Sequence, residues 1–93
     1  MQTKNVALIT GGTGDIGTAV AKQLNSSYAT VVALDLISAD SGTQWMKALI
    51  DEGYDNITYR HMDVTNFEQC EEVIGSIISE YGNIDALINN AGI

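Results

Sequence analysis

The sequence predicts an α/β fold in which helices cover both faces of a parallel sheet. Short apolar segments rich in valine and isoleucine alternate along the chain with segments whose apolar residues recur at helical spacing. The apolar segments are nearly continuous, which is typical of strands that are buried on both faces. A glycine-rich segment at residues 11–17 joins the first of them to the first helical segment, and such a junction is common in this fold class.

Four strands are predicted, and we expect them to lie side by side in one sheet. Each is an apolar run bounded by polar residues or glycine, and the four span residues 5–10, 30–34, 57–62 and 84–88. Right-handed crossovers between consecutive parallel strands give the order 3-2-1-4, counted along the chain. This arrangement is the N-terminal half of a doubly wound parallel sheet, the Rossmann fold.

The first two helices are predicted from the spacing of their apolar residues and from their ends. The first spans about residues 16–25. The segment Ser41-Gly42-Thr43-Gln44 resembles a capping box and predicts the start of the second, which we expect to end near Gly53. The apolar faces consist of Ile16, Ala19, Val20 and Leu24 in the first helix and of Trp45, Ala48 and Leu49 in the second.

The third helix has the clearest pattern in the chain. The segment Thr65-Asn66-Phe67-Glu68 resembles a second capping box, with Thr65 as the capping residue, and Gly82 is a typical C-terminal stop. We expect the acidic residues of this helix to face solvent and its apolar stripe to pack against the sheet. The stripe consists of Phe67, Cys70, Val73, Ile74, Ile77, Ile78 and Tyr81.

The glycine-rich segment predicts a binding site for the pyrophosphate of a dinucleotide. Glycines let the backbone turn tightly and approach the phosphates closely, and the N–H groups that open the next helix face the anion. The alternative is a glycine-rich turn without a ligand, but a strand before it, a helix after it and an acid further on favour the site. The predicted contact residues are Gly11, Gly12, Thr13, Gly14, Asp15, Ile16 and Gly17.

Asp35, at the end of the second predicted strand, bears on the choice of cofactor. Dinucleotide-binding folds carry an acid about 20 residues beyond the glycines, where it accepts hydrogen bonds from the adenosine ribose. The 2′-phosphate of NADP would meet a like charge there, and residues 11–17 and 36–46 contain neither Lys nor Arg. The sequence therefore favours NAD(H) over NADP(H). The alternative is that Asp35 is only a turn or cap residue.

Two further polar segments follow predicted strands and are expected at the same edge of the sheet. Asp63 and Val64 follow the third strand, where the carboxylate would accept from the adenine amino group; equally, Asp63 would be an acid that precedes the third helix. Asn89-Asn90-Ala91-Gly92 follows the fourth strand, where such folds bind ligands, and a polar turn is the alternative. We predict that the ribose and nicotinamide side is lined by Asn90, Ala91, Gly92 and Ile93.

The composition narrows the expected partners. The formal net charge is −8, so neither a nucleic acid nor an anionic membrane surface is an expected partner. No apolar run reaches the about 18 residues of a membrane span, and no signal peptide is recognised. Cys70 is the single cysteine, which suits a reducing cytoplasm. We expect Cys70 and Trp45 to pack in the core and His61 to be structural, and the sequence suggests no metal site.

Taken together, these motifs resemble the short-chain dehydrogenase/reductase family. The Asn-Asn-Ala-Gly segment is typical of its reductase branch. Trp45-Met46-Lys47 followed by Gly53-Tyr54 adds a closer resemblance to acetoacetyl-CoA reductases and related 3-oxoacyl reductases. The elements that match the family in order and spacing are Thr10 to Gly17, Asp35, Asp63-Val64 and Asn89-Asn90-Ala91-Gly92.

The resemblance implies an NAD(P)-dependent reductase that transfers hydride to a 3-oxoacyl thioester of CoA or an acyl carrier, and that forms a homotetramer. It also implies that the catalytic Ser, Tyr and Lys lie beyond the Asn-Asn-Ala-Gly segment. None of the four tyrosines is followed four residues later by lysine. We therefore expect residues 1–93 to be one NAD(P)-binding domain, an N-terminal fragment without catalytic residues that is inactive alone.

Two other functions stay open at this point. A non-catalytic dinucleotide sensor would share the binding motifs and lack the downstream catalytic residues. An epimerase-like member of the family's extended branch is suggested by the glycines at 11, 14 and 17, because the reductase branch usually has glycine where this chain has Asp15. The Asn-Asn-Ala-Gly segment favours the reductase over the epimerase-like alternative.

Overall fold

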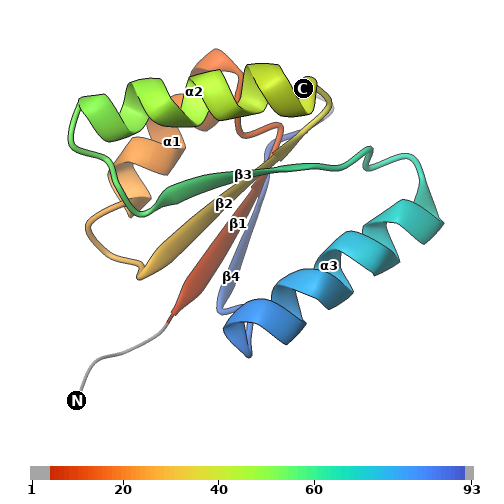
Figure 1. Ribbon diagram of the computed structural model, residues 1–93. Helices are drawn as coiled ribbons and strands as arrows, with labels where there is room; N and C mark the ends of the chain where they lie inside the picture. The colour runs from red at the N-terminus through yellow and green to blue at the C-terminus, as the bar shows by residue number, and fades with distance from the viewer. Residues whose placement is uncertain (1–4, 92–93) are drawn as a thin grey trace.

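The computed structural model describes residues 5–91, which form a parallel sheet with helices on both faces (Figure 1). The order across the sheet is β3-β2-β1-β4, which confirms the predicted order. Strands and helices alternate as β1 (Val6–Thr10), α1 (Asp15–Leu24), β2 (Thr30–Asp35), α2 (Ala39–Asp51), β3 (Ile57–His61), α3 (Phe67–Tyr81) and β4 (Ala86–Asn89).

Apolar side chains fill a layer on each side of the sheet. Helices α1 and α2 lie over one face and α3 over the other. The buried residues on the α3 side are Val6, Leu8, Val32, Leu34, Met62 and Ile77. Those on the side of α1 and α2 are Ile9, Ala21, Val31, Leu49 and Ile57. Neighbouring residues of β1 and β2 point to opposite layers, which explains why both strands are apolar along their length.

The predicted start of α2 is wrong by about one turn. The helix begins at Ala39, and its N-cap is Ser38, whose Oγ accepts a hydrogen bond from the backbone N–H of Ser41 at 3.1 Å. Both serines are good capping residues, but only Ser38 is in the extended conformation that a cap requires. Ser41 and Gly42 therefore lie inside the helix, and Gly42 packs against the ring of Tyr59.

The predicted start and apolar stripe of α3 also need correction. The N-cap is Asn66, whose side chain accepts from the backbone N–H of Gln69 at 3.1 Å, because the hydroxyl of Thr65 bonds to Asp63 instead. Phe67 and Ile78 belong to the predicted stripe but are 74% and 45% exposed. The residues that do pack on the sheet are Cys70, Val73, Ile74, Ile77 and Tyr81. Gly82 ends the helix as predicted, with φ of 92°.

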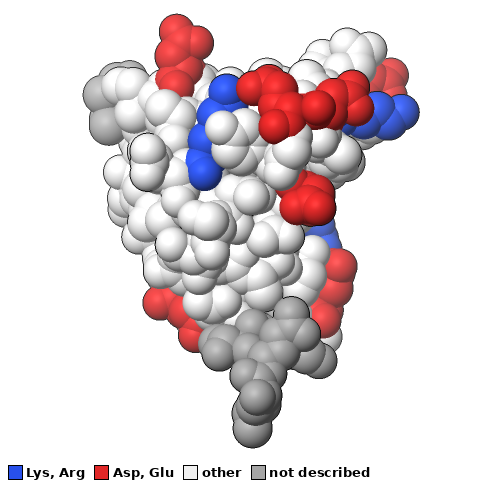
Figure 2. All heavy atoms as spheres, turned by 90° about the vertical axis from the view of Figure 1, so that its left-hand side faces the viewer, with Lys and Arg blue, Asp and Glu red and all other residues white. Residues whose placement is uncertain are grey.

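The surface carries more acidic than basic side chains, and on the face in Figure 2 the few basic ones lie beside acidic ones. Lys22 of α1 pairs with Glu52 at 3.2 Å, and its Nζ lies 5.4 Å from the centre of the Tyr54 ring. Between residues 5 and 91, no helix has the length and apolar character of a membrane span. Over the same range, no cluster of His, Cys, Asp and Glu is arranged to hold a metal ion.

Candidate functional site

A cleft of about 610 Å³ lies at the carboxyl edge of the sheet. The segments that follow all four strands contribute to it, as expected for an open parallel sheet, where ligands bind at this edge. Its lining residues are Gly11, Gly14, Asp15, Ile16, Leu34, Asp35, Leu36, Met62, Asp63, Val64, Thr65, Asn90 and Ala91.

Three glycines shape the loop between β1 and α1: one has a left-handed backbone, and the other two leave no room for a side chain. Gly11 has φ of 63°, in the left-handed region that favours glycine. A Cβ on Gly12 would lie 2.7 Å from the Cβ of Ala33, and one on Gly17 would lie 2.7 Å from the Cα of Gly12. Gly12 thereby packs the loop against β2, and Gly17 brings α1 close to the loop that follows β1. Gly14 has space around it, with its nearest neighbour at 3.7 Å.

The N-terminus of α1 opens onto the cleft. Its N-cap is Gly14, so no side chain caps the helix, and the cap carbonyl accepts from Thr18 N at 2.8 Å. A helix N-terminus carries a partial positive charge and free N–H groups, and it is suited to an anion such as a phosphate. Asp15 and Ile16 lie in the first turn, are exposed, and line the cleft.

The carboxylate of Asp35 is tied to the glycine loop. Its Oδ2 accepts from the backbone N–H of Thr13 at 3.0 Å and from the Thr13 hydroxyl at 2.5 Å, and its Oδ1 accepts from the N–H of Leu36 at 2.8 Å. Partial burial raises the pKa of Asp35, but the hydrogen bonds from Thr13 and Leu36 outweigh it and lower the pKa below its ordinary value. The group is therefore an anion at neutral pH on the wall of the cleft.

The chain beyond Asp35 is held by β3. The hydroxyl of Tyr59 lies 3.0 Å from the carbonyl oxygen of Asp35 and 2.5 Å from that of Ile37. The Nδ1 of His61 lies 3.1 Å from the same Ile37 oxygen. Burial raises the pKa of Tyr59, and the negative charge of Asp35 raises it further. These contacts fix the turn that carries Leu36 into the cleft.

Asp63 lines the cleft and also organises the turn before α3. Its Oδ1 accepts from the hydroxyl of Thr65 at 2.6 Å and from the Thr65 backbone N–H at 2.9 Å, and its own N–H donates to Gln69 at 2.6 Å. The bonds from Thr65 lower the pKa of Asp63. The interpretation of Asp63 as an acid that leads into the helix therefore has direct structural support, and its place in the cleft is compatible with the adenine contact.

A single hydroxyl joins the ends of β1 and β4. The Oγ1 of Thr10 accepts from the backbone N–H groups of Asn90 at 3.0 Å and Ala91 at 3.1 Å, and it lies 3.2 Å from the side-chain oxygen of Asn89. The Asn90 side chain donates to the carbonyl oxygen of Gly11 at 3.0 Å. The predicted contact residues Asn90 and Ala91 line the cleft, whereas Gly92 and Ile93 lie outside the described residues.

The structure brings nine of the predicted contact residues to the cleft wall and leaves three behind it: Gly12, Thr13 and Gly17. Sequence reasoning missed four lining residues, which are Leu34, Leu36, Met62 and Thr65. Leu36 and Val64 are 59% and 46% exposed, so each offers an apolar surface to a ligand. Leu36 could have been identified from its position, because it directly follows the acid at the end of β2.

Three residues that the sequence assigned to structural roles lie away from the cleft lining. Trp45 packs in the layer under α1 and α2, and its indole N–H donates to the hydroxyl of Thr18 at 3.1 Å. Cys70 is half-buried against the other layer, with its Sγ 3.4 Å from the carbonyl oxygen of Asp63. His61 is exposed at the end of β3. Each has a local contact that is consistent with the structural interpretation.

Comparisons of the sequence and of the fold with known proteins find dehydrogenases and reductases. The short chain dehydrogenase family matches residues 5–93. Secoisolariciresinol dehydrogenase of Forsythia intermedia is 39% identical over 88 residues, covering 95% of this chain and 30% of the relative. Acetoacetyl-CoA reductase of Allochromatium vinosum is 36% identical over 89 residues, covering 95% of this chain and 36% of the relative.

Among solved structures, menthone neomenthol reductase of Mentha piperita superposes with a TM-score of 0.86 at 29% identity, covering 99% of this chain and 33% of that chain. The chain thus spans about a third of the length of the relatives it matches. The family match over residues 5–93 includes the glycine loop and all four strands described above.

Proposed function

The chain belongs to the short chain dehydrogenase family of oxidoreductases, and we propose that its cleft binds NAD(H) for a carbonyl reductase. The observation that carries this proposal is the Asp35 carboxylate, ionised and fixed on the cleft wall beside the glycine loop. The bound cofactor would supply hydride. The residues of this chain would hold that cofactor in the cleft.

The cleft fits a dinucleotide in shape and in polarity. Gly12 and Gly17 pack so tightly against β2 and the loop that an added Cβ would overlap the backbone, and the uncapped N-terminus of α1 faces the cleft. Its N–H groups would bind the pyrophosphate. Asp35 would accept from the ribose hydroxyls, and the exposed apolar side chains of Leu36 and Val64 would contact the adenine ring.

The preference for NAD(H) over NADP(H) rests on charge. Asp15, Asp35 and Asp63 line the cleft, and none of its lining residues is Lys or Arg. A 2′-phosphate next to Asp35 would bring two anions together without a cation between them, and close like charges at an interface are strongly unfavourable. The 2′-hydroxyl of NAD would instead donate to the carboxylate.

For the substrate, we propose a 3-oxoacyl thioester of the acetoacetyl-CoA type, reduced to the 3-hydroxyacyl form. This rests on the 36% identity to an acetoacetyl-CoA reductase and on the motifs discussed above. The residues described here would hold the cofactor, and the chain covers only 36% of that relative. Reduction is therefore proposed for the whole protein that contains this sequence.

Calorimetric titration of the chain with NADH and with NADPH tests the cofactor proposal. We expect NADH to bind at least about tenfold more tightly, corresponding to about 1.4 kcal/mol. Equal or tighter NADPH binding would contradict the assignment. The substrate is tested separately by adding acetoacetyl-CoA and NADH to the product of the whole gene. Binding of NADH without its consumption would favour a sensor over a reductase.

A further inference from the structure

We propose that Thr13, which does not line the cleft, is a positioning residue that sets cofactor preference by fixing the Asp35 carboxylate. The inference rests on the proposed binding of NAD(H) and deepens it, because it names the residue that gives Asp35 its orientation. Thr13 lies in the glycine loop and Asp35 at the end of β2, so the contact joins two elements that meet at the carboxyl edge of the sheet.

The geometry is that of a two-point attachment. The backbone N–H and the side-chain hydroxyl of Thr13 both donate to Oδ2 of Asp35, at 3.0 and 2.5 Å. The N–H of Leu36 donates to Oδ1 at 2.8 Å. Both oxygens are therefore held from the protein side, and a carboxylate held at both oxygens cannot rotate freely about its terminal bond.

Counting lone pairs indicates which oxygen is left for a ligand. An ionised carboxylate has about four acceptor positions. Thr13 occupies the two on Oδ2, and Leu36 occupies one on Oδ1. The remaining position is on Oδ1. A ribose hydroxyl would therefore find one acceptor in a fixed direction, which favours binding because no side-chain ordering is needed when the ligand arrives.

The same attachment would make Asp35 a stronger barrier to a 2′-phosphate. A free aspartate can rotate its charge away from an incoming anion, but a carboxylate held by Thr13 cannot. Removing the Thr13 hydroxyl should thus weaken NADH binding and at the same time relax the rejection of NADPH. A residue that only stabilised the loop would weaken both cofactors equally.

The test compares Thr13→Val, which keeps the branched shape and the backbone N–H, with Thr13→Ser, which keeps the hydroxyl. Thr43→Val, at an exposed position of α2, is the matched control. We expect Thr13→Val to weaken NADH binding about tenfold, as loss of a charged hydrogen bond predicts, and to lower the ratio of NADPH to NADH dissociation constants. Thr13→Ser and Thr43→Val should stay within about twofold of wild type.

A second measurement separates this inference from the proposed function. The pKa of the Asp35 carboxyl, followed by carbon NMR without any cofactor, should rise in Thr13→Val and stay unchanged in Thr13→Ser. If Thr13→Val does not fold, Thr13→Ala, which also removes the hydroxyl and keeps the backbone N–H, takes its place in both measurements. An unchanged pKa together with an unchanged cofactor ratio would overturn the role of Thr13. A raised pKa in a chain that does not bind NADH would instead overturn the proposed function alone.

Discussion

The two faces of the sheet are built differently. On the side of α1 and α2, close backbone contacts at Gly12 and Gly17, the packing of Gly42 on Tyr59 and the bond from Trp45 to Thr18 fix the helices against the strands. On the α3 side, Gly75 has open space around it, and Phe67, Ile78 and Leu87 are exposed. The cleft geometry therefore depends mainly on the first face, and the second should tolerate change.

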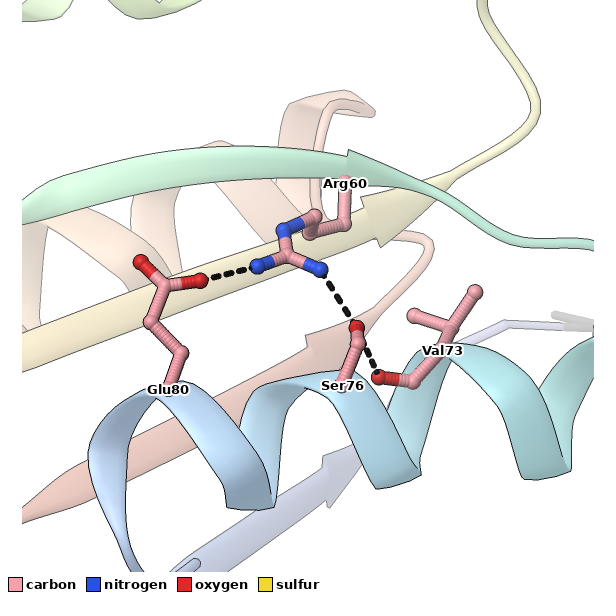
Figure 3. A network of polar contacts seen from close by, with 4 residues as sticks. All are labelled: Arg60, Val73, Ser76 and Glu80. Carbon is pink, nitrogen blue, oxygen red and sulfur yellow. Dashed lines mark hydrogen bonds and ion pairs between the residues drawn. The ribbon is translucent and has the colours of Figure 1, made fainter.

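On the α3 face, polar contacts at the sheet edge add to the apolar layer under the helix. Arg60 of β3 pairs with Glu80 and donates to the hydroxyl of Ser76 at 2.6 Å, and that hydroxyl donates to the carbonyl oxygen of Val73 at 2.9 Å (Figure 3). Both partners of the ion pair are partly exposed, with side-chain exposures of 31% and 51%. Exposed ion pairs of this kind contribute little to stability.

The largest difference between the two faces should appear when a methyl group is added to a helical glycine on each. Gly17→Ala should destabilise the chain by about 3 kcal/mol, because the new Cβ overlaps backbone that cannot rotate away. Gly75→Ala in α3 should stabilise it by about 0.5–1 kcal/mol through helix propensity alone. Urea unfolding of both variants measures this. A loss of stability in Gly75→Ala would contradict the open, exposed position of Gly75.

A smaller loss of stability is expected when the charge of Asp35, which is hydrogen-bonded at the cleft wall, is removed. Because its folded-state pKa is lowered, Asp35 contributes stability that is fully present above its unfolded pKa of about 3.9 and is lost as the pH falls through the lower folded value. Asp35→Asn should therefore cost only about 1 kcal/mol at neutral pH, because solvent screens the partly exposed carboxylate, and nothing at the acid end. Thermal unfolding of the wild type and the variant from neutral to acid pH tests whether the cost disappears as the pH falls. A cost independent of pH would argue against an ionised Asp35.

The smallest loss of stability should follow removal of the ion pair between Arg60 and Glu80 on the α3 side. Arg60→Met keeps an unbranched apolar stem and removes the charge, and it should cost about 0.5 kcal/mol at low salt. High salt should abolish the difference from wild type, since screening is strong for exposed pairs. A salt-independent loss above about 2 kcal/mol would indicate that α3 is held as firmly as α1, in conflict with surface-pair energetics.

Much of the fold could be predicted because its signals are local. The apolar runs and the glycine loop determine the strand order once right-handed crossovers are assumed. The helix starts could not be predicted as well, because Ser38 and Ser41, or Thr65 and Asn66, are all suitable caps. The choice depends on which backbone is extended and on competing partners such as Asp63, which no local pattern reports.

The same difference between local signals and long-range contacts applies to the candidate site. Asp35 could be identified from its distance to the glycines, but its attachment to Thr13 joins residues 22 positions apart and depends on how closely the loop approaches β2. Phe67 and Ile78 matched the helical period of the α3 stripe and are exposed all the same, because periodicity indicates which residues share a face and not how wide the covering surface is.

The hydroxyl of Thr10, on which two backbone amides converge, has a consequence for the kinetics of binding. It links the turn after β4 to the end of β1, and the side chain of Asn90 adds a second link to Gly11. The ends of β1 and β4 are thereby joined on the cleft wall and should move as one body. A ligand would then meet an entrance of constant width, and its association rate would be set by diffusion and charge rather than by the frequency with which a gate opens.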